Sequence, residues 1–316
     1  MDLKQLRFFC GVVEAGSFTK AAEFLYIAQP ALGLQIRHLE EELGVPLLVR
    51  HSRGVTPTEA GQLLYRHAEA LLRQFERVRQ DMLDFAGEPR GRVCLGLTPT
   101  LALALAATLV ETCRSRYPGI ILNIAEGLSE WLMEWAESDR LDIVLTYNRK
   151  QEKGIHAQAL AEEVLYFVSP RGVGESKGAT VTFDTAIGHD LILPSGPFGL
   201  RAMVDEAARR RERQPRIVCE AESVLTIRDL VRRGFGHTIL PLGAVRPEVD
   251  AGSVVARRIT DPELSRTLYL GYSIKRPGSK AITAVCQEIR AAVTKLAAGG
   301  QMGWTALSAP TVVAAA

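Results

Sequence analysis

A chain of 316 residues is long enough for two or three domains rather than one compact core. Its 47% hydrophobic and 23% charged residues are typical of soluble globular proteins, and the lack of a bilayer-length apolar run argues against a membrane-embedded protein. The net charge of +2 does not by itself indicate a nucleic-acid partner, so the placement of the charges has to carry that argument.

Signals for metal, redox chemistry and secretion are weak. The five cysteines are far apart without a CxxC pair, and the six histidines show no ligand spacing. Buried reduced thiols are therefore favoured over a redox switch or a metal site, and we expect no metal and no cofactor. Asp2, Lys4 and Arg7 interrupt the apolar residues at the start, unlike a signal peptide, so we expect a cytoplasmic protein that does not bind membranes.

The N-terminal region is expected to be helical. Apolar residues at near-helical spacing over 3–13 predict a first helix, which Gly16 ends. Ser17 is then placed to cap a short second helix, with Phe24 on its core side. Pro30 suits the first turn of a third helix, because the first helical turn tolerates a missing N–H.

The third helix is expected to run to about Leu43, before Gly44. Its buried positions are predicted to be Leu32, Ile36, Leu39 and Leu43, and its exposed positions Gln29, Gly33, Arg37 and Glu40.

Two short helices around a tight turn are the pattern of a helix-turn-helix, whose second helix presents its N-terminal residues to base edges in the major groove. The amide of Gln29 is suited to adenine. Gly33 costs about 1 kcal/mol in mid-helix relative to Ala, and close approach of the backbone to DNA would explain it. Residues 47–55 are interpreted as a small wing with basic side chains suited to phosphates. The residues predicted to contact DNA are Ser17, Thr19, Lys20, Gln29, Pro30, Gly33, Leu34, Arg37, Arg50, His51 and Arg53.

Charge alone leaves an alternative open. Residues 1–58 carry six basic and six acidic side chains, so this segment is neutral overall. On periodicity alone a three-helix bundle that binds nothing, with Arg50 and Arg53 merely solvated, remains an alternative.

A long helix is predicted from Glu59 to about Phe85, capped by Thr58. It carries an apolar seam at alternating spacings of four and three residues, flanked by charged residues, which is typical of a coiled coil. The seam, and the predicted dimer contact, consists of Leu64, Ala68, Leu71, Phe75, Val78, Met82 and Phe85. The alternative is that the seam packs against its own domain.

Beyond a hinge at 87–91, short apolar strands alternate with helices, which favours an α/β fold. Ligands in such folds bind at the carboxyl ends of the strands. Thr98 and Thr100 lie at such a strand-to-helix corner, where two hydroxyls and free helix N–H groups suit a carboxylate or another anion. Ordinary helix capping by Thr98 or Thr100 is the alternative. The glycine pair at Gly172 and Gly174 lacks the context of a dinucleotide-binding loop, and no nucleophile elbow or acid/base pair can be placed, so we do not expect an enzyme.

Five stretches of the N-terminal region together resemble the opening of LysR-type transcription regulators: 3–9, 16–22, 29–36, 39–48 and 56–61. The resemblance implies a winged helix-turn-helix that reads DNA as a dimer, paired through the long helix. Two positions depart from the family pattern. Ala28 stands where the family usually has a capping serine, at a cost of about 0.5–2 kcal/mol if uncompensated. Gly33 and Leu34 stand where the family often has Ser-Arg, so Leu34 is expected either to touch a thymine methyl or to pack inward.

Residues 234–241 also resemble this family, through a Gly-x-Gly followed by Leu240 and Pro241. The resemblance implies two subdomains like those of type 2 periplasmic binding proteins, with chain crossings near Phe167 and Leu270 and a ligand in the cleft between them. Carried over position by position, the effector-binding residues are Thr98, Thr100, Ser129, Thr146, Phe198 and Ser223. No Arg or Lys is securely placed among them.

The sequence thus predicts an N-terminal all-α winged helix-turn-helix and a C-terminal α/β domain of two subdomains. The expected parts are the DNA-binding domain 1–58, the dimerisation helix 59–86, the hinge 87–91, the effector domain 92–298 and a disordered tail 299–316. Within the effector domain, subdomain I covers 92–166 and 270–298, and subdomain II covers 167–269.

We expect a transcription regulator that binds promoter DNA at an interrupted palindrome, as a dimer or tetramer. A small organic acid is expected to act as co-inducer, with RNA polymerase as a candidate partner. The alternative is a small-molecule-binding protein or an enzyme of the α/β class without a DNA-binding role.

Overall fold

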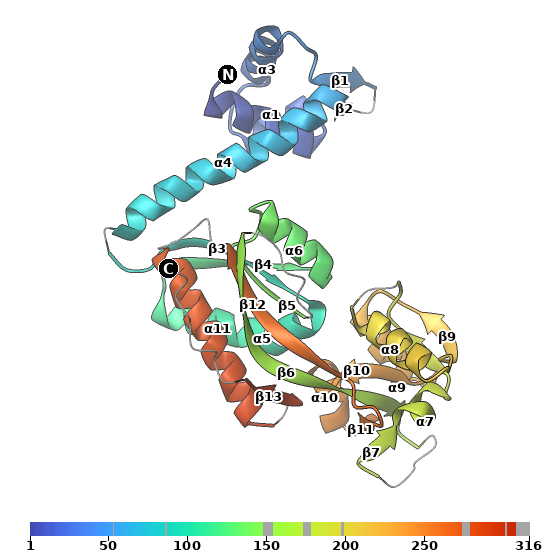
Figure 1. The fold of residues 1–316 in the computed structure, drawn as a ribbon. Helices are drawn as coiled ribbons and strands as arrows, with labels where there is room; N and C mark the ends of the chain where they lie inside the picture. The colour runs from blue at the N-terminus through green and yellow to red at the C-terminus, as the bar shows by residue number, and fades with distance from the viewer. Residues whose placement is uncertain are drawn as a thin grey trace. The chain divides into compact units, whose positions relative to one another are not determined.

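The computed structural model describes residues 1–52, 54–85, 87–147, 154–172, 178–196, 199–273, 279–300 and 302–307. They belong to two compact units, Met1–Ala86 and Gly87–Ala316, each of which is treated by itself (Figure 1). No described helix is long and apolar enough to cross a membrane. Nowhere in the described ranges do three His, Cys, Asp or Glu side chains gather as a metal site requires.

The first unit is a helical bundle in which capping side chains and glycines mark several of the helix ends. Asp2 accepts a hydrogen bond from Gln5 N at the start of the first helix, and Ser17 accepts one from Lys20 N at the start of the second. Gly16 and Gly44 end helices with φ of 59° and 70°, the left-handed conformation that glycine adopts most easily. The three helices are α1 (Leu3–Ala15), α2 (Phe18–Phe24) and α3 (Gln29–Leu43). Their shared core includes Phe9, Val12, Leu32, Ile36 and Leu39.

Four predictions of burial in this unit are wrong, and the first is Gly33, which is half-buried rather than exposed. Phe24 is 75% exposed rather than on the core side, because α2 buries Phe18, Ala21 and Ala22 instead. Leu43 is 38% exposed in the last turn of α3, beyond the region that α1 and α2 cover. Glu40 is half-buried, since its carboxylate accepts hydrogen bonds from the backbone N–H groups of residues 47 and 48.

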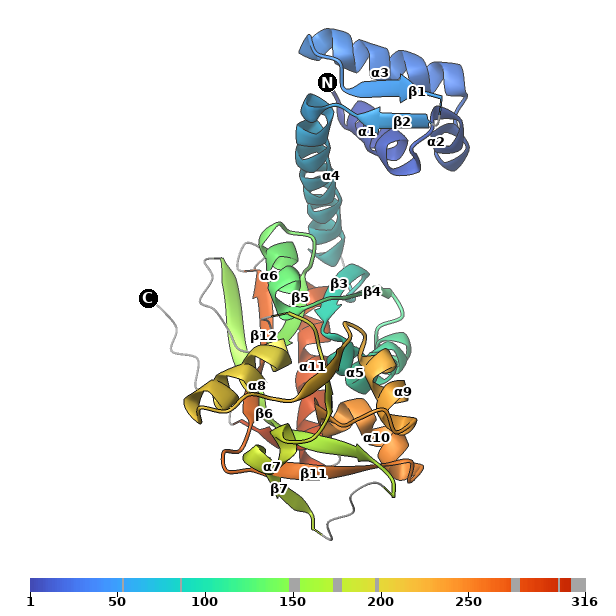
Figure 2. The same cartoon turned by 90° about the vertical axis from the view of Figure 1, so that its right-hand side faces the viewer.

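A hairpin and a long helix complete the unit: β1 (Leu48–His51), β2 (Gly54–Pro57) and α4 (Glu59–Phe85). In Figure 2 the hairpin is drawn between α3 and the first two helices. Thr58 caps α4 as predicted, because its hydroxyl accepts from Gly61 N at 2.9 Å and donates to Pro46 O at 2.8 Å. A Cβ at Gly61 would lie 2.0 Å from Leu47 O, so only glycine allows this packing of α4 against the hairpin.

The second unit begins with an α/β layer that forms subdomain I. Strand β3 runs parallel to β4 and β5, and β12 runs antiparallel to β5. Helices α5 and α11 pack on one face of the sheet and α6 on the other. The elements are β3 (Gly91–Leu97), α5 (Pro99–Arg116), β4 (Ile120–Glu126), α6 (Ser129–Glu137), β5 (Ile143–Tyr147), β12 (Ser265–Ser273) and α11 (Lys280–Ala298).

Subdomain II has its own core, built around Phe167, Phe183, Ile192, Val204 and Ile227. Strands β10 and β11 both pair antiparallel with β6, and β8 pairs parallel with β9. Its elements are β7 (Thr180–Thr182), α7 (Phe183–Ile187), β8 (Leu191–Leu193), α8 (Gly199–Arg210), β9 (Ile217–Glu220), α9 (Val224–Arg232), β10 (Thr238–Pro241), α10 (Leu242–Asp250) and β11 (Val254–Thr260).

Strand β6 (Ile155–Pro170) runs through both subdomains (Figure 1). Its residues Leu160 and Ala161 belong to the first core, whereas Leu165 already belongs to the second. The chain returns between Leu264, which packs in the second core, and Leu268, which packs in the first. The sequence analysis placed this second crossing near Leu270, which is several residues beyond its position in the structure.

The prediction of a disordered tail is wrong for residues 302–307. Strand β13 (Trp304–Ala306) pairs antiparallel with β6, opposite residues 161–163. Trp304 is 4% exposed, and its indole N–H donates to Glu163 Oε1 at 2.6 Å. Burial of this large aromatic side chain and its hydrogen bond offset the cost of ordering the segment.

His237, which follows the Gly-x-Gly pair, is buried in subdomain II. Its Nδ1 lies 3.1 Å from Ser169 Oγ, and its ring stacks on Phe167 and lies 4.6 Å from the His189 ring. Burial lowers the pKa of His237, and His189 and Arg257 lower it further, against the smaller opposite effect of Asp190. The folded protein therefore holds His237 in its neutral form.

A folded-state pKa below the ordinary value means that the unfolded chain takes up the proton first as pH falls. The contribution to stability is complete above the unfolded pKa of about 6.5 and is lost as pH falls through the lower folded pKa. We expect the Tm of the protein to drop as pH falls below about 6.5, and His237→Gln to flatten this dependence. Thermal unfolding followed by near-ultraviolet circular dichroism checks it, and an equally steep drop in the variant would contradict it.

Candidate DNA interface and effector pocket

The N-terminus of α3 is the exposed end of a well-anchored helix. Leu32, Ile36 and Leu39 fix its inner face in the core, while Gln29 and Pro30 are exposed. Ala28 precedes the helix with extended backbone and provides no side-chain cap, as the missing serine led us to expect. The first N–H groups of α3 are thus free of a capping side chain and suited to an anionic partner such as a DNA phosphate.

The outward face of α3 continues along Leu34 and Arg37, both exposed. Leu34 is 47% exposed, so of the two expected arrangements the structure has the outward one, in which an apolar side chain is available to a thymine methyl. Gly33 is half-buried, and a Cβ built on it meets no atom within 4 Å. Packing within the protein therefore does not explain the glycine.

Replacing Gly33 by Ala is expected to stabilise the protein and weaken DNA binding. The space around the residue accepts a methyl group, and Ala in a helix is favoured over Gly by about 1 kcal/mol. If the glycine serves close approach to DNA, the added methyl costs affinity of about tenfold or more at the operator. Thermal denaturation checks the expected gain in stability, and fluorescence anisotropy checks the expected loss of operator affinity. A more stable variant with unchanged operator affinity would contradict the DNA-contact role.

The remaining predicted DNA contacts surround α3. Ser17 is half-buried and occupied in capping α2, whereas Thr19 and Lys20 on its first turn are exposed. Arg50 and His51 are exposed on the hairpin, and the Arg50 guanidinium carbon lies 4.2 Å from the Phe18 ring centroid. This cation–π contact holds Arg50 beside the start of α2. Arg53 lies outside the described residues.

An exposed aromatic pair next to α3 was not predicted from the sequence. Phe24 and Tyr26 are 75% and 93% exposed, and Tyr26 has a φ of 54°. A bulky residue with positive φ is unusual, and the turn between α2 and α3 requires it here. The signal available in the sequence was that Ala21 and Ala22 already fill the inner face of α2, which leaves Phe24 outside.

The seam of α4 divides into two parts. Ala68 is fully buried and Leu64 half-buried against the core of their own unit, so the predicted dimer contact is wrong for Ala68 and the alternative of packing within the unit holds there. Beyond them, four apolar side chains are 46–60% exposed: Leu71, Phe75, Val78 and Met82. The side chain of Phe85 lies outside the described residues. Contacts from α1, such as the Arg7–Glu76 ion pair, anchor α4 to the bundle without covering these four.

Thr98 and Thr100 meet at the N-terminus of α5. Thr98 is 8% exposed and its hydroxyl does not cap the helix, so ordinary capping by Thr98 is ruled out. The two hydroxyl oxygens are 3.4 Å apart. A pair of hydroxyls thus lies beside uncapped helix N–H groups, an arrangement that suits an anion.

An arginine absent from the sequence prediction joins this corner. Arg266 Nη2 lies 3.5 Å from Thr100 Oγ1, and the guanidinium carbon lies 3.5 Å from the Tyr147 ring centroid. Arg266 also forms an ion pair with Glu163, at 2.6 Å, with both side chains buried. Burial acts to lower the pKa of Arg266, but Glu163 and Tyr147 outweigh it and the net shift is upward, so the side chain is a permanent cation.

The structure brings together only part of the predicted effector set. Ser129 Oγ accepts a weak hydrogen bond from Tyr147 N at 3.4 Å and so lies next to the corner. Thr146 is buried on the opposite face of β5, where its hydroxyl lies 3.9 Å from Met133 Sδ of α6, because successive side chains of a strand alternate. Ser223 is exposed and caps α9 by accepting from Thr226 N. Phe198 lies outside the described residues.

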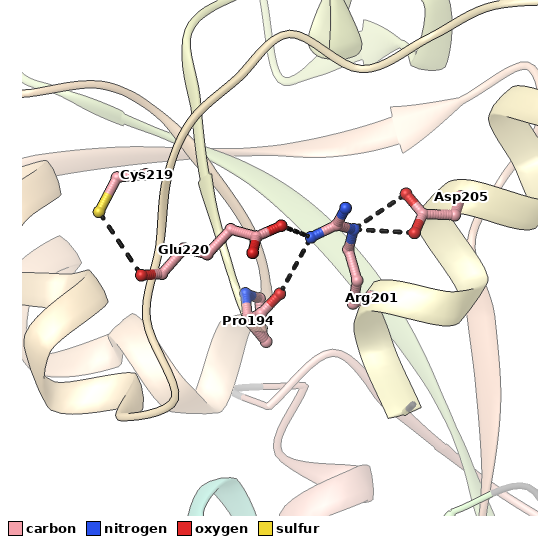
Figure 3. Close-up of polar contacts among 5 residues, drawn as sticks. All are labelled: Pro194, Arg201, Asp205, Cys219 and Glu220. Atoms are coloured by element: carbon pink, nitrogen blue, oxygen red, sulfur yellow. Dashed lines mark hydrogen bonds and ion pairs between the residues drawn. The ribbon is translucent and has the colours of Figure 1, made fainter. Parts of the chain in front are cut away.

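A second arginine organises the subdomain II corner at the start of α8 (Figure 3). Arg201 donates to Pro194 O at 3.3 Å, to Glu220 at 2.5 Å and to Asp205 at 2.8 Å. Its side chain is 15% exposed. Two carboxylates neutralise this guanidinium, so it ties the loop after β8 to β9 and α8.

None of the five cysteines, all of which the structure describes, is in a disulfide. Burial raises the pKa of Cys10 to about 12 and that of Cys286 to about 11, so both are protonated and unreactive near neutral pH. Cys113 is also buried, whereas Cys94 and Cys219 are half-buried.

Comparison with known proteins assigns both units. Residues 3–62 match the model of the bacterial regulatory helix-turn-helix protein, lysR family, and residues 86–294 match the LysR substrate binding domain. The nitrogen assimilation regulatory protein nac of Klebsiella aerogenes is 36% identical over 93% of this chain and 96% of its own length. The DNA-binding transcriptional dual regulator OxyR of Escherichia coli is 31% identical over 88% of this chain and 90% of its own.

Solved structures show the same fold. A full-length OxyR variant from Pseudomonas aeruginosa superposes with a TM-score of 0.69 at 25% identity, covering 92% of this chain and 98% of that one. CbnR in complex with its target DNA superposes with a TM-score of 0.72 at 21% identity, covering 92% and 100%. The helix-turn-helix unit and the two-subdomain α/β unit are thus the two parts of one known architecture, and the chain belongs to the LysR family of DNA-binding transcriptional regulators.

Proposed function

We propose that the chain binds promoter DNA at an interrupted palindrome as a dimer joined through α4, and that a small organic acid in the effector domain alters this binding. The observation that carries the proposal is the uncapped, exposed N-terminus of α3 on a rigid core, in a unit that also presents an unpartnered apolar stripe. Two such units, joined along the stripe, reach two half-sites of an operator. Association of dimers into a tetramer and contact with RNA polymerase belong to the same proposal, and the protein would act in the cytoplasm.

The organic-acid proposal is supported by the Thr98–Thr100 corner. Its hydroxyls, the α5 N-terminus and the nearby Arg266 are all donors, which suits a ligand rich in acceptor oxygens. Arg266 is already paired with Glu163, so the corner lacks the surplus positive charge that a dianion requires. A monoanionic carboxylate is the ligand class that this balance favours.

Fluorescence anisotropy with the promoter region beside the protein's own gene tests DNA binding. We expect tight binding that weakens steeply with salt, because basic side chains displace counterions from the phosphates. Absent or salt-insensitive binding would overturn the DNA-binding part of the proposal.

A thermal-shift comparison on the full-length protein tests the effector class. Metabolic monocarboxylic acids are expected to raise the Tm, whereas their neutral amides are not, since only the acids complement the donors at the corner. Thr100→Val should reduce the shift. Equal shifts with acids and amides would remove the argument for an organic acid.

A further inference from the structure

A chain of buried polar contacts leads from the Thr98–Thr100 corner to the C-terminal strand. Thr100 Oγ1 is 3.5 Å from Arg266 Nη2, and Arg266 Nε donates to Glu163 Oε2 at 2.7 Å. The other oxygen of that carboxylate, Oε1, accepts from the Trp304 indole N–H at 2.6 Å. One carboxylate therefore holds both the cation at the corner and the aromatic anchor of β13.

The buried Arg266–Glu163 ion pair contributes little net stability, so a role beyond stability would explain its presence. The side chains are only 7% and 2% exposed, and burying an ion pair costs several kcal/mol of desolvation that its attraction barely repays. Apolar residues of similar volume would hold β6 and β12 together at least as well. The ion pair is also sensitive to any change in its partners, because removing or diverting one of them leaves the other charge buried and unpaired.

A donor at the same corner points to a ligand. Tyr147 is 5% exposed, and its hydroxyl makes no hydrogen bond of good geometry although Thr100, Glu163 and Arg266 surround it. Burial and then Glu163 raise its pKa well above 10, so it stays protonated and available to donate. A buried donor whose geometry to its neighbouring acceptor Glu163 is poor is costly, and an acceptor oxygen entering beside Thr100 would satisfy it better.

Strand β13 is short and is held mainly by the buried side chains of Trp304 and of its neighbour Met302. It pairs with three residues of β6 at an edge, and its segment adds backbone hydrogen bonds from Val164 N to Gly303 O and from Leu307 N to Leu160 O. Such a short edge strand belongs to the low-stability end of a fold, so these side-chain anchors decide whether it stays docked.

The same segment touches the other subdomain. Met302 packs in the core of subdomain I, and a Cβ built on Gly243 of α10 would lie 2.1 Å from its terminal methyl carbon. The neighbours of Gly243 on α10, Ala244 and Val245, lie in the core of subdomain II. Residues 302–304 therefore bridge the two subdomains, next to their crossing strands.

We propose that an anionic effector at the Thr98–Thr100 corner draws Arg266 away from Glu163, and that the Glu163 carboxylate, left buried and unpaired, then moves from its place toward water. Trp304 thereby loses its acceptor, and β13 is released as a latch between the subdomains. This inference rests on the proposed function, since it assigns a readout to the same effector site. Arg266 needs little movement, because its Nη2 already approaches Thr100 Oγ1. Release of β13 then allows the two subdomain cores to change their relative orientation, so a local exchange of ion-pair partners acts on the whole effector domain.

A carboxylate built into the corner tests the latch without knowledge of the effector. Thr100→Glu places a negative charge within reach of Arg266, and Thr100→Gln is the matched neutral control. Position 100 lies in the first turn of α5, where a carboxylate is favourable to the helix, so the variant should fold. Of the three tryptophans, Trp131 and Trp135 are replaced by Phe, which leaves Trp304 as the reporter.

We expect the Glu variant, but not the Gln variant, to shift Trp304 emission to longer wavelength and to speed hydrogen exchange of the 304–307 amides, relative to the parent. Identical emission and exchange in the two variants, with both folded by circular dichroism, would overturn the latch.

A second arm tests the ion pair itself. Glu163→Gln keeps an acceptor for Trp304 but strands the Arg266 cation, so the Tm should fall by about 6 °C or more. Adding Thr100→Glu should restore much of that loss, because it supplies Arg266 with a new partner, whereas Thr100→Gln should not. Equal Tm values for the two double variants would contradict the exchange of partners.

These outcomes are separable from those of the proposed function. If organic acids raise the Tm while Thr100→Glu leaves Trp304 unchanged, the effector site stands and the latch fails. If no acid binds but Thr100→Glu moves Trp304, the coupling stands and the ligand class is wrong.

Discussion

Leu71→Glu is expected to convert the protein into a monomer that binds its operator about a hundredfold more weakly or worse. Leu71 is 50% exposed in the single chain and lies in the apolar stripe of α4. Burying a leucine stabilises an interface by about 1.5–3 kcal/mol, and a symmetric dimer loses two, so dimerisation should weaken by about 10²- to 10⁴-fold. A monomer presents one α3 to one half-site and loses the gain of tethered binding.

Leu63→Glu is a closely matched control. Leu63 is also on α4, is also 50% exposed and receives the same charge, but it lies off the stripe formed by Leu71, Phe75, Val78 and Met82. Sedimentation equilibrium gives the oligomeric state of each variant, and anisotropy on full and half operators gives the affinity. A Leu71→Glu protein that stays dimeric, or a Leu63→Glu protein that dissociates equally, would place the dimer contact elsewhere.

The N-terminal unit was predictable to the extent that its signals are local. Ser17, Gly16 and Gly44 mark helix ends through backbone conformation and hydrogen bonds within a few residues, and the structure confirms each. The side on which Phe24 lies depends instead on the angle at which α2 crosses α1 and α3. Periodicity over a helix of only seven residues does not determine that angle.

The effector corner was predicted from one side only. Thr98 and Thr100 are recognisable because a strand-to-helix turn with hydroxyls is a local pattern. Arg266 lies 166 positions from Thr100, and only the register of β12 beside β6 brings it there. Thr146 was assigned to the effector-binding residues, although the alternation along β5 turns it to the face opposite this corner.

The ordered C-terminal segment was missed for a related reason. Small residues on either side of Trp304 are typical of a frayed end, and the stabilising contact is a single indole–carboxylate hydrogen bond to a strand far away in sequence. Trp304 itself was the available signal, because an exposed tryptophan in a disordered tail is unfavourable.

Gln29→Ala is expected to reduce affinity for the operator by about 5- to 150-fold while leaving binding to unrelated duplexes nearly unchanged. Gln29 is exposed at the start of α3, where the core behind the helix fixes its position. A side-chain amide that pairs with an adenine edge contributes about 1–3 kcal/mol of discrimination, and its removal affects only the sequence that carries this base.

Arg50→Ala should instead weaken binding to all duplexes and lower the salt slope by about one, because a cation beside phosphates reads no sequence.

Gln62→Ala provides the control for Gln29, since it deletes an exposed amide of the same size from the first turn of α4. Anisotropy with the operator, with single-base variants of it and with an unrelated duplex distinguishes the cases. The decisive pattern is selectivity: the Gln29 variant should lose its preference at one base pair of each half-site and bind the remaining variants in parallel with the parent. Uniform weakening across all duplexes would make Gln29 a backbone contact, and base reading would then fall to Leu34 and Arg37 on the outward face of α3.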